Sequence, residues 1–177
     1  TAVLFSLIYN QNYGVLNDLL TKIGLISENV AWLASTKVIL GAVVVAELWR
    51  GIPFFAISLL AGMQGLSQDV YEAARVDGAN KIKTFIYVTL PLLKDTIVLT
   101  TLLRTIWEFN SVDLIYSLTG GGPVGKTTTL SMLIANQALT TNNYGYGSAI
   151  SVVSFFILAI IAVIYMKASG FGKGSEE

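Results

Sequence analysis

Hydrophobic positions along the chain gather into three long apolar stretches separated by polar segments. Residues 38–63, 90–118 and 149–166 are each long enough to cross a bilayer as a helix, which takes about 20 residues. Residues 1–9 are apolar but too short to span alone, and we interpret them as the end of a membrane helix in an N-terminally truncated chain. Residues 130–139 are similarly short and predict an interfacial or re-entrant helix.

Composition indicates a membrane location. Of the 177 residues, 54% are hydrophobic and 12% are charged, whereas soluble domains carry about 25% charged residues. The mean hydropathy is +0.67, and residues 127–166 contain no Asp, Glu, Lys or Arg. We therefore predict an all-α fold, a polytopic transmembrane helical bundle that forms a single domain over residues 1–177.

Charge and residue types restrict the chemistry that the chain can perform. The formal net charge is zero, so the sequence shows no basic footprint for a nucleic acid. Cysteine and histidine are both absent, which removes thiolate chemistry, the commonest general base and the commonest metal ligand. We expect no catalytic residues, no metal site and no cofactor, and hence no enzymatic activity in this chain.

Basic residues indicate the orientation of the chain in the membrane. Residues 64–95 carry Arg75, Lys81, Lys83 and Lys94, and Lys167 and Lys173 follow the last apolar stretch. The opposite side has Lys22, Lys37 and Lys126. By the positive-inside rule, the loop and the C-terminus face the cytoplasm in a multi-pass arrangement.

The polar segment over residues 10–36, on the outer side, contains four residues that commonly form turns: Gly14, Asn17, Gly24 and Asn29. We expect it to be a loop with short amphipathic pieces.

The cytoplasmic loop, residues 64–91, predicts two short helices joined by a turn. Asp69 and Glu72 have the spacing of a capping box, with Asp69 as the cap of the first helix. Gly78 is expected to end that helix in the left-handed conformation, and Asn80 to cap the second helix. By spacing alone, a solvated connector is as good an interpretation as a docking surface.

The same loop resembles the EAA loop of binding-protein-dependent ABC importer permeases. The matching residues are Glu72-Ala73-Ala74, Asp77-Gly78-Ala79, Phe85, Val88 and Leu90-Pro91, with Val88 in place of the usual isoleucine. Further family segments match in order at 49–54, 59–66 and 118–123, so the resemblance covers nearly the whole chain. It is closest to sugar permeases of the maltose and glycerol-phosphate type.

The resemblance implies a type I importer permease of a bacterial inner membrane that forms half of the translocation pathway for a sugar or related polyol. It implies four partners: a dimer of cytoplasmic ABC ATPases, a second and different permease subunit, an extracytoplasmic solute-binding protein and the lipid membrane. ATP hydrolysis would belong to the ATPases. In such permeases the first helix of the loop is a coupling helix that sits in a groove of the ATPase. The resemblance assigns this contact to Tyr71, Glu72, Ala73, Ala74, Asp77, Gly78 and Ala79.

Two polar stripes interrupt the apolar stretches at helical spacing. The first consists of Glu47, Arg50, Gly51 and Phe54, and the second of Arg104, Trp107, Glu108 and Ser111. A charge at mid-bilayer costs roughly 2.5–3.5 kcal/mol on insertion scales, so these side chains should face protein or water.

The stripes have a functional and a structural interpretation. The resemblance puts substrate contacts on these two helices, and it implies a substrate pathway lined by Glu47, Arg50, Gly51, Arg104, Trp107, Glu108, Asn110 and Ser111. Related permeases often carry amides where this chain has Glu47 and Glu108, which leaves the solute open. The structural alternative is that the charges form ion pairs that lock helices together.

Residues 120–127 satisfy the phosphate-loop pattern G-x-x-x-x-G-K-[ST]. A strand-like segment at 112–118 and a helix-like segment at 128–139 flank it in the expected order. We nevertheless predict a turn without nucleotide, because the orientation places it on the outer side and the chain has no room for an α/β nucleotide-binding domain.

Two other function classes remain as alternatives. A secondary transporter would use Glu47 and Glu108 as proton or sodium sites. A non-transporting membrane scaffold that binds an ATPase would tolerate replacement of both carboxylates. Dependence of uptake on ATP, instead of on membrane potential, separates an ABC importer from a secondary transporter.

Overall fold

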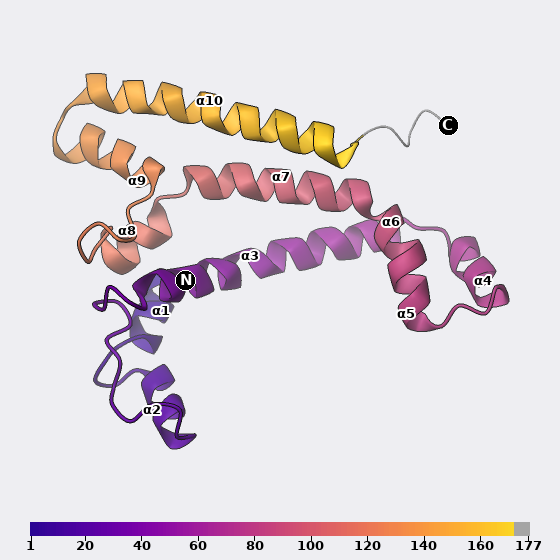
Figure 1. Cartoon of the computed structure of the whole chain (residues 1–177), viewed down its shortest axis with the longest axis horizontal. Coiled ribbons are helices and arrows are strands. Elements are labelled where there is room, and N and C mark those ends of the chain that lie inside the picture. The colour runs from indigo at the N-terminus through magenta and orange to yellow at the C-terminus, as the bar shows by residue number, and fades with distance from the viewer. Residues whose placement is uncertain (172–177) are drawn as a thin grey trace. The chain divides into compact units, whose positions relative to one another are not determined.

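The computed structural model describes residues 1–171, so the predicted cytoplasmic Lys173 lies outside the described residues. Within this part of the chain every regular element is a helix. The three longest are α3 (Ile39–Gln64), α7 (Lys94–Asn110) and α10 (Tyr144–Ser169) (Figure 1). The shorter helices are α1 (Ala2–Ile8), α2 (Val15–Lys22), α4 (Gln68–Val76), α5 (Lys81–Thr84), α6 (Leu90–Leu92), α8 (Asp113–Thr119) and α9 (Leu130–Ala135), with π-helical turns at Phe85–Thr89 and Asn136–Thr140. The all-α prediction is confirmed.

Two helices, α3 and α10, are long and apolar enough to span a membrane by themselves. A third candidate span is the pair Lys81–Leu92 and Lys94–Asn110, which is bent by 64°. The first and third predicted spans are therefore confirmed. The expectation of one unbroken helix over residues 90–118 is wrong, because α7 ends at Asn110 and α8 starts anew at Asp113.

The chain forms two compact units. The first unit contains residues 1–50 and 108–156, and the second contains residues 51–107 and the segment from residue 157. The single domain over residues 1–177 stays a prediction.

The core of the first unit lies where α1 and α8 pack with the beginning of α3. Phe5, Tyr9, Ala42, Ala46 and Leu114 are all buried in one cluster. The Tyr9 hydroxyl donates to the Ala42 carbonyl of α3 at 2.9 Å. The helix α1 itself lies beside α8.

The polar segment that follows α1 is organised around Asn17, which lies inside α2 and is 2% exposed. Its Oδ1 accepts from Val30 N at 3.2 Å and Trp32 Nε1 at 2.8 Å, and its Nδ2 donates to the carbonyls of Gln11 and Val30. The expectation that Asn17 forms a turn is wrong. Its amide instead satisfies backbone groups of the loop, as buried polar groups require.

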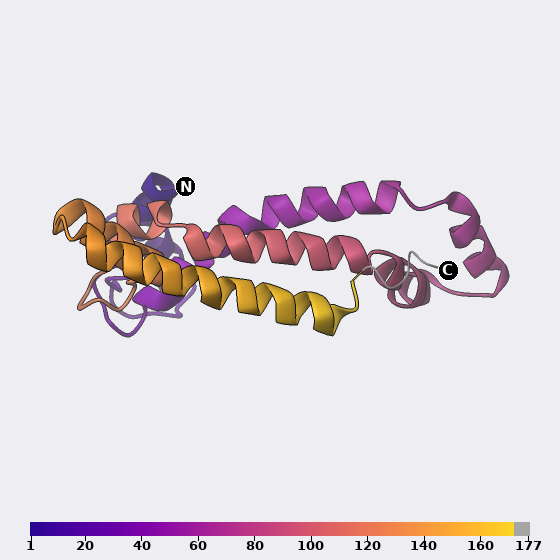
Figure 2. The same ribbon diagram turned by 90° about the horizontal axis from the view of Figure 1, so that it is seen from above.

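In the second unit, the later half of α3 runs antiparallel to α7. Gly62, near the end of α3, faces Leu93 and Thr96 around the start of α7. Gly51, nearer the start of α3, faces Arg104, which comes later in α7. Cβ atoms built on these two glycines would lie 3.0–3.2 Å from the facing side chains, so the glycines permit a close approach. Beyond the ends of these two helices lie α4 and α5 (Figures 1 and 2).

Candidate functional site

The helix α4 begins two residues earlier than the capping-box prediction requires. Its N-cap is Ser67, which has an extended backbone and makes no side-chain cap hydrogen bond. Asp69 lies in the first turn, where a carboxylate is favourable beside the positive end of the helix dipole. The predicted cap at Asp69 is therefore wrong, although the acidic first turn still favours a helix start here.

The turn between α4 and α5 has the predicted geometry. Gly78 has φ +76°, its N–H donates to the Arg75 carbonyl at 3.0 Å, and the N–H of Ala79 donates to the Ala74 carbonyl at 2.9 Å. This pair of bonds is the Schellman motif, which satisfies the last carbonyls of a helix. Asn80 Oδ1 accepts from Lys83 N at 2.9 Å, so the predicted cap of the second helix is confirmed.

The predicted coupling residues differ in their exposure. Glu72, Ala73, Asp77 and Gly78 are exposed, and Tyr71 and Ala79 are partly buried. Ala74, which the resemblance assigns to the same contact, is only 7% exposed. Ala74 packs inward, and only Ala73 of this pair is open to a partner.

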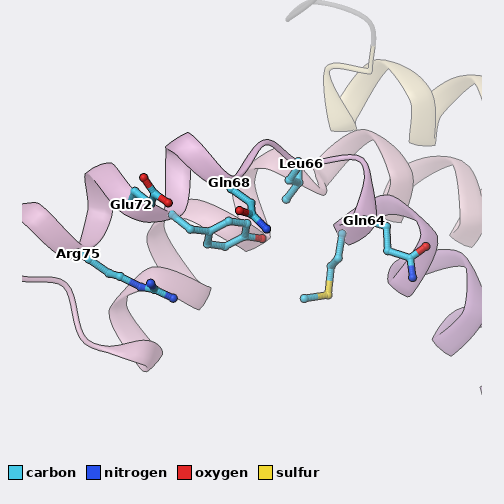
Figure 3. Close-up of a pocket in the computed structure, with 7 residues that line it drawn as sticks. Gln64, Leu66, Gln68, Glu72 and Arg75 are labelled. Atoms are coloured by element: carbon cyan, nitrogen blue, oxygen red, sulfur yellow. The ribbon is translucent and has the colours of Figure 1, made fainter.

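A groove of about 500 Å³ lies beside α4. Its lining residues come from the end of α3, the connecting turn and α4: Met63, Gln64, Leu66, Gln68, Tyr71, Glu72 and Arg75. Figure 3 shows Glu72 and Arg75 projecting from α4, with Gln64 at the end of α3. The groove therefore offers a carboxylate, a guanidinium, two amides and apolar surface to an incoming side chain.

A second polar site is centred on Arg50 in the first unit, and we call it the Arg50 cluster: Glu47, Arg50, Glu108, Ser111 and Asp113. The Nε atom of Arg50 lies 3.0 Å from Glu47 Oε2. One terminal nitrogen donates to both oxygens of Asp113 at 3.0 and 3.1 Å, and the other donates to Ser111 Oγ at 2.8 Å and lies 3.4 Å from Glu108 Oε1. Every nitrogen of this guanidinium is engaged by the protein.

Asp113 is a member that the sequence analysis missed, because it lies two residues beyond the last position of the polar stripe. The Ser111 hydroxyl donates to its Oδ1 at 2.8 Å. This bond holds the pKa of Asp113 below its ordinary value; partial burial opposes the shift and Arg50 adds to it. Ser111 and Asp113 flank the point where the helix is interrupted, between Asn110 and Asp113. A carboxylate directly after a predicted polar stripe was the available signal.

The other predicted pathway residues fall into different places. Gly51 and Arg104 face each other in the second unit. There the Trp107 ring also packs on Phe54, with 4.9 Å between ring centroids. Asn110 is exposed at the C-terminal end of α7. The eight predicted residues thus divide between the two units.

The segment that satisfies the phosphate-loop pattern has a different local structure. The residues before it form the helix α8 instead of the expected strand, so that expectation is wrong. The hydroxyl of Thr127, which would have to bind Mg²⁺, is 3% exposed and donates to the Gly122 carbonyl at 3.0 Å. Gly120, Gly121 and Gly125 all have positive φ. These features favour a tightly folded turn over a phosphate cradle.

Comparisons with known proteins agree with the arrangement of these helices. The family described as binding-protein-dependent transport system inner membrane component matches residues 2–170. The trehalose/maltose transport system permease protein MalF of Thermococcus litoralis is 40% identical over 96% of this chain and 56% of its own length. The sulfoquinovosyl glycerol transport system permease protein SmoG of Agrobacterium fabrum is 38% identical over 93% of this chain and 53% of its own.

A solved structure shows the same fold. A bacterial alginate ABC transporter in complex with an alginate pentasaccharide-bound periplasmic protein has a chain that matches with a TM-score of 0.83 at 23% identity, over 95% of this chain and 58% of that one. The chain spans between 53% and 58% of the length of these three relatives. With the family matched over nearly all of its residues, the chain belongs to the binding-protein-dependent transport system inner membrane components.

Proposed function

We propose that this chain belongs to the permease subunit of an ATP-driven importer and forms half of the translocation pathway for a sugar or related polyol. Two relatives named for trehalose/maltose and sulfoquinovosyl glycerol transport support a saccharide as the solute. The alginate transporter, which carries a periplasmic protein, supports an extracytoplasmic solute-binding protein as a partner. The chain itself performs no covalent chemistry, and partner subunits hydrolyse ATP.

The observation that carries this proposal is the structure of α4. The helix ends in a Schellman turn at Gly78 and presents Glu72 and Ala73 to solvent beside an open groove. A preformed helix with an exposed small residue and a charged residue suits docking, because little conformational entropy is lost when it binds. We assign the contact with a cytoplasmic ATPase to Tyr71, Glu72, Ala73, Asp77, Gly78 and Ala79, with Ala74 supporting the helix from its buried side.

The partners and the orientation follow from the same proposal. Two ABC ATPases bind at the cytoplasmic side, a second and different permease subunit completes the pathway, and the C-terminus lies in the cytoplasm. Movement of α4 during ATP binding and hydrolysis switches access from the outer to the inner side of a bacterial inner membrane.

Polar groups for the solute come from two sets of residues. One set is the Arg50 cluster, and the other is Gly51, Arg104 and Trp107 in the second unit, with Asn110 at the end of α7. Carboxylates accept hydrogen bonds from sugar hydroxyls, and an aromatic ring packs on the apolar face of a sugar. The ion pairs of the Arg50 cluster also support a structural role, and the two roles are compatible.

The test uses the full-length permease with its ATPase and binding protein in proteoliposomes. We expect Glu72→Lys to abolish most of the ATP hydrolysis stimulated by the loaded binding protein, because it reverses the charge of an exposed docking residue. Glu28→Lys is the matched control, since it makes the same charge change at an exposed residue of the outer segment.

Unchanged stimulation in Glu72→Lys would show that the loop is only a connector. Uptake that then depends on membrane potential instead of ATP would favour a secondary transporter with Glu47 and Glu108 as ion sites.

A further inference from the structure

The Arg50 cluster holds a guanidinium with no nitrogen left over for a substrate. Glu47 lies against Nε. Both carboxylate oxygens of Asp113 accept from one terminal nitrogen, and Ser111 and Glu108 contact the other. Arginine recognises carboxylate, sulfonate and phosphate groups through paired N–H donors. An anionic sugar would therefore have to displace a protein carboxylate before Arg50 could bind it.

The balance of charge points the same way. In α3 the charged residues are Glu47 and Arg50, and between residues 98 and 119 they are Arg104, Glu108 and Asp113. Three carboxylates thus stand against two guanidiniums, even when the arginine of the second unit is counted. A segment with excess carboxylate disfavours an additional negative charge and accepts hydrogen bonds from neutral hydroxyls.

Asp113 is the most accessible carboxylate of the cluster. Its side chain is 76% exposed, whereas those of Glu108 and Glu47 are 36% and 14% exposed. Asp113 is also held in one position, by Arg50 and by the Ser111 hydroxyl at 2.8 Å. A fixed and accessible carboxylate is a preorganised acceptor for a hydroxyl group and a fixed source of repulsion for an anion.

We propose that Asp113, positioned by Arg50 and Ser111, makes the pathway select uncharged sugars and reject anionic ones. This inference rests on the proposed function, because it specifies the class of solute that the same pathway admits. Arg50 acts as a positioning residue that holds the acceptor, and Asp113 is the specificity-determining residue. The expected solutes are neutral saccharides or polyols, in contrast to uronates, sulfonated sugars and sugar phosphates.

The test measures binding to the full-length permease complex in nanodiscs by saturation-transfer NMR, without the solute-binding protein, whose own selectivity would otherwise interfere. The probes are three matched pairs: maltose, trehalose and cellobiose, each with its C6-oxidised uronic-acid form. Each pair has the same ring geometry and differs in one charge. We expect neutral members to bind about tenfold more tightly than their uronates.

Variants assign the preference to the proposed residue. Asp113→Asn keeps the size of the side chain and removes its charge, and we expect the preference for neutral over anionic sugars to fall at least about threefold. Asp69→Asn, at an exposed carboxylate of α4, is the matched control and should leave the ratio unchanged. Global unfolding would lower the binding of both probes together, so the ratio reports selectivity.

Three results would overturn the inference: uronates that bind as well as the neutral sugars, an unchanged ratio in Asp113→Asn, or no binding of any saccharide. The proposed function is judged separately, by the stimulated ATP hydrolysis of Glu72→Lys. If Glu72→Lys loses the stimulated ATP hydrolysis as expected, but neutral and anionic sugars bind equally, the selectivity is refuted and the importer assignment stays in place.

Discussion

Polar side chains serve opposite purposes in the first unit and in the α4–α5 segment of the second. In the first unit, the Asn17 amide makes four hydrogen bonds, and each nitrogen of Arg50 lies against a carboxylate or hydroxyl oxygen of the protein. In α4, Glu72 and Arg75 line an open groove. The first pattern holds neighbouring segments together, and the second leaves groups available to a partner. Stabilising contacts dominate in the first unit and open surface in α4, while Asp113 combines the two, since it pairs with Arg50 and is 76% exposed.

The largest effect should come from Arg50→Met, which removes the shared partner of three carboxylates. We expect a loss of about 3 kcal/mol in the free energy of unfolding, the low end for deleting one partner of a buried pair, because 22% of the Arg50 side chain is exposed. Thermal unfolding of the detergent-solubilised full-length permease measures it. Lys94→Met, at an exposed cation of α7, serves as the control. Equal midpoints for both variants would contradict a consolidating role for Arg50.

A smaller loss should follow Asn17→Ala. The substitution leaves donors on Val30 and Trp32 without their acceptor, which costs about 2 kcal/mol when the groups are buried. Limited proteolysis within residues 10–36 should accelerate accordingly. Asn29→Ala changes an exposed amide of the same segment and should leave the cleavage rate as it is. If both variants are cleaved alike, the segment does not depend on the buried amide.

Gly78→Ala tests the turn that ends α4 in the second unit. A side chain at φ +76° is strained by about 1–2 kcal/mol, so α4 should fray, with faster hydrogen exchange and weaker stimulated ATP hydrolysis. Gly41→Ala is the control, since that helical glycine lacks the left-handed conformation and its Cβ would meet no atom within 4 Å. Full stimulation in Gly78→Ala would mean that the turn is not needed for coupling.

The smallest effect concerns pH. The lowered pKa of Asp113 means that the folded chain binds this proton more weakly than the unfolded chain, whose value is near 3.8. The carboxylate therefore stabilises the fold above about pH 4, and this contribution disappears as the pH falls through the folded pKa. Because the side chain is 76% exposed, solvent screens the effect. The fall in melting temperature between about pH 6 and pH 3 should be slightly smaller in Asp113→Asn, and an identical fall would contradict the assignment.

Much of the fold was predictable where local rules and hydrophobic pattern agree. The spans α3 and α10 follow from apolar length, and the turn at Gly78 and the cap at Asn80 follow from the conformations that these residue types favour. The candidate site was less predictable. Asp113 escaped detection because helical spacing was extended across a break, and its partner Arg50 lies 63 positions earlier in the chain.

The sequence by itself determined the class of protein, the spanning helices, the turn between α4 and α5 and the family, because hydrophobic length, glycine conformation and a local motif are properties of short segments. Only the tertiary structure decided which alanine of the motif is exposed, which side chains surround Arg50 and where the second predicted span ends. Burial and ion pairing depend on neighbours that are distant in the chain, and no local pattern records which of several compatible partners a side chain finds.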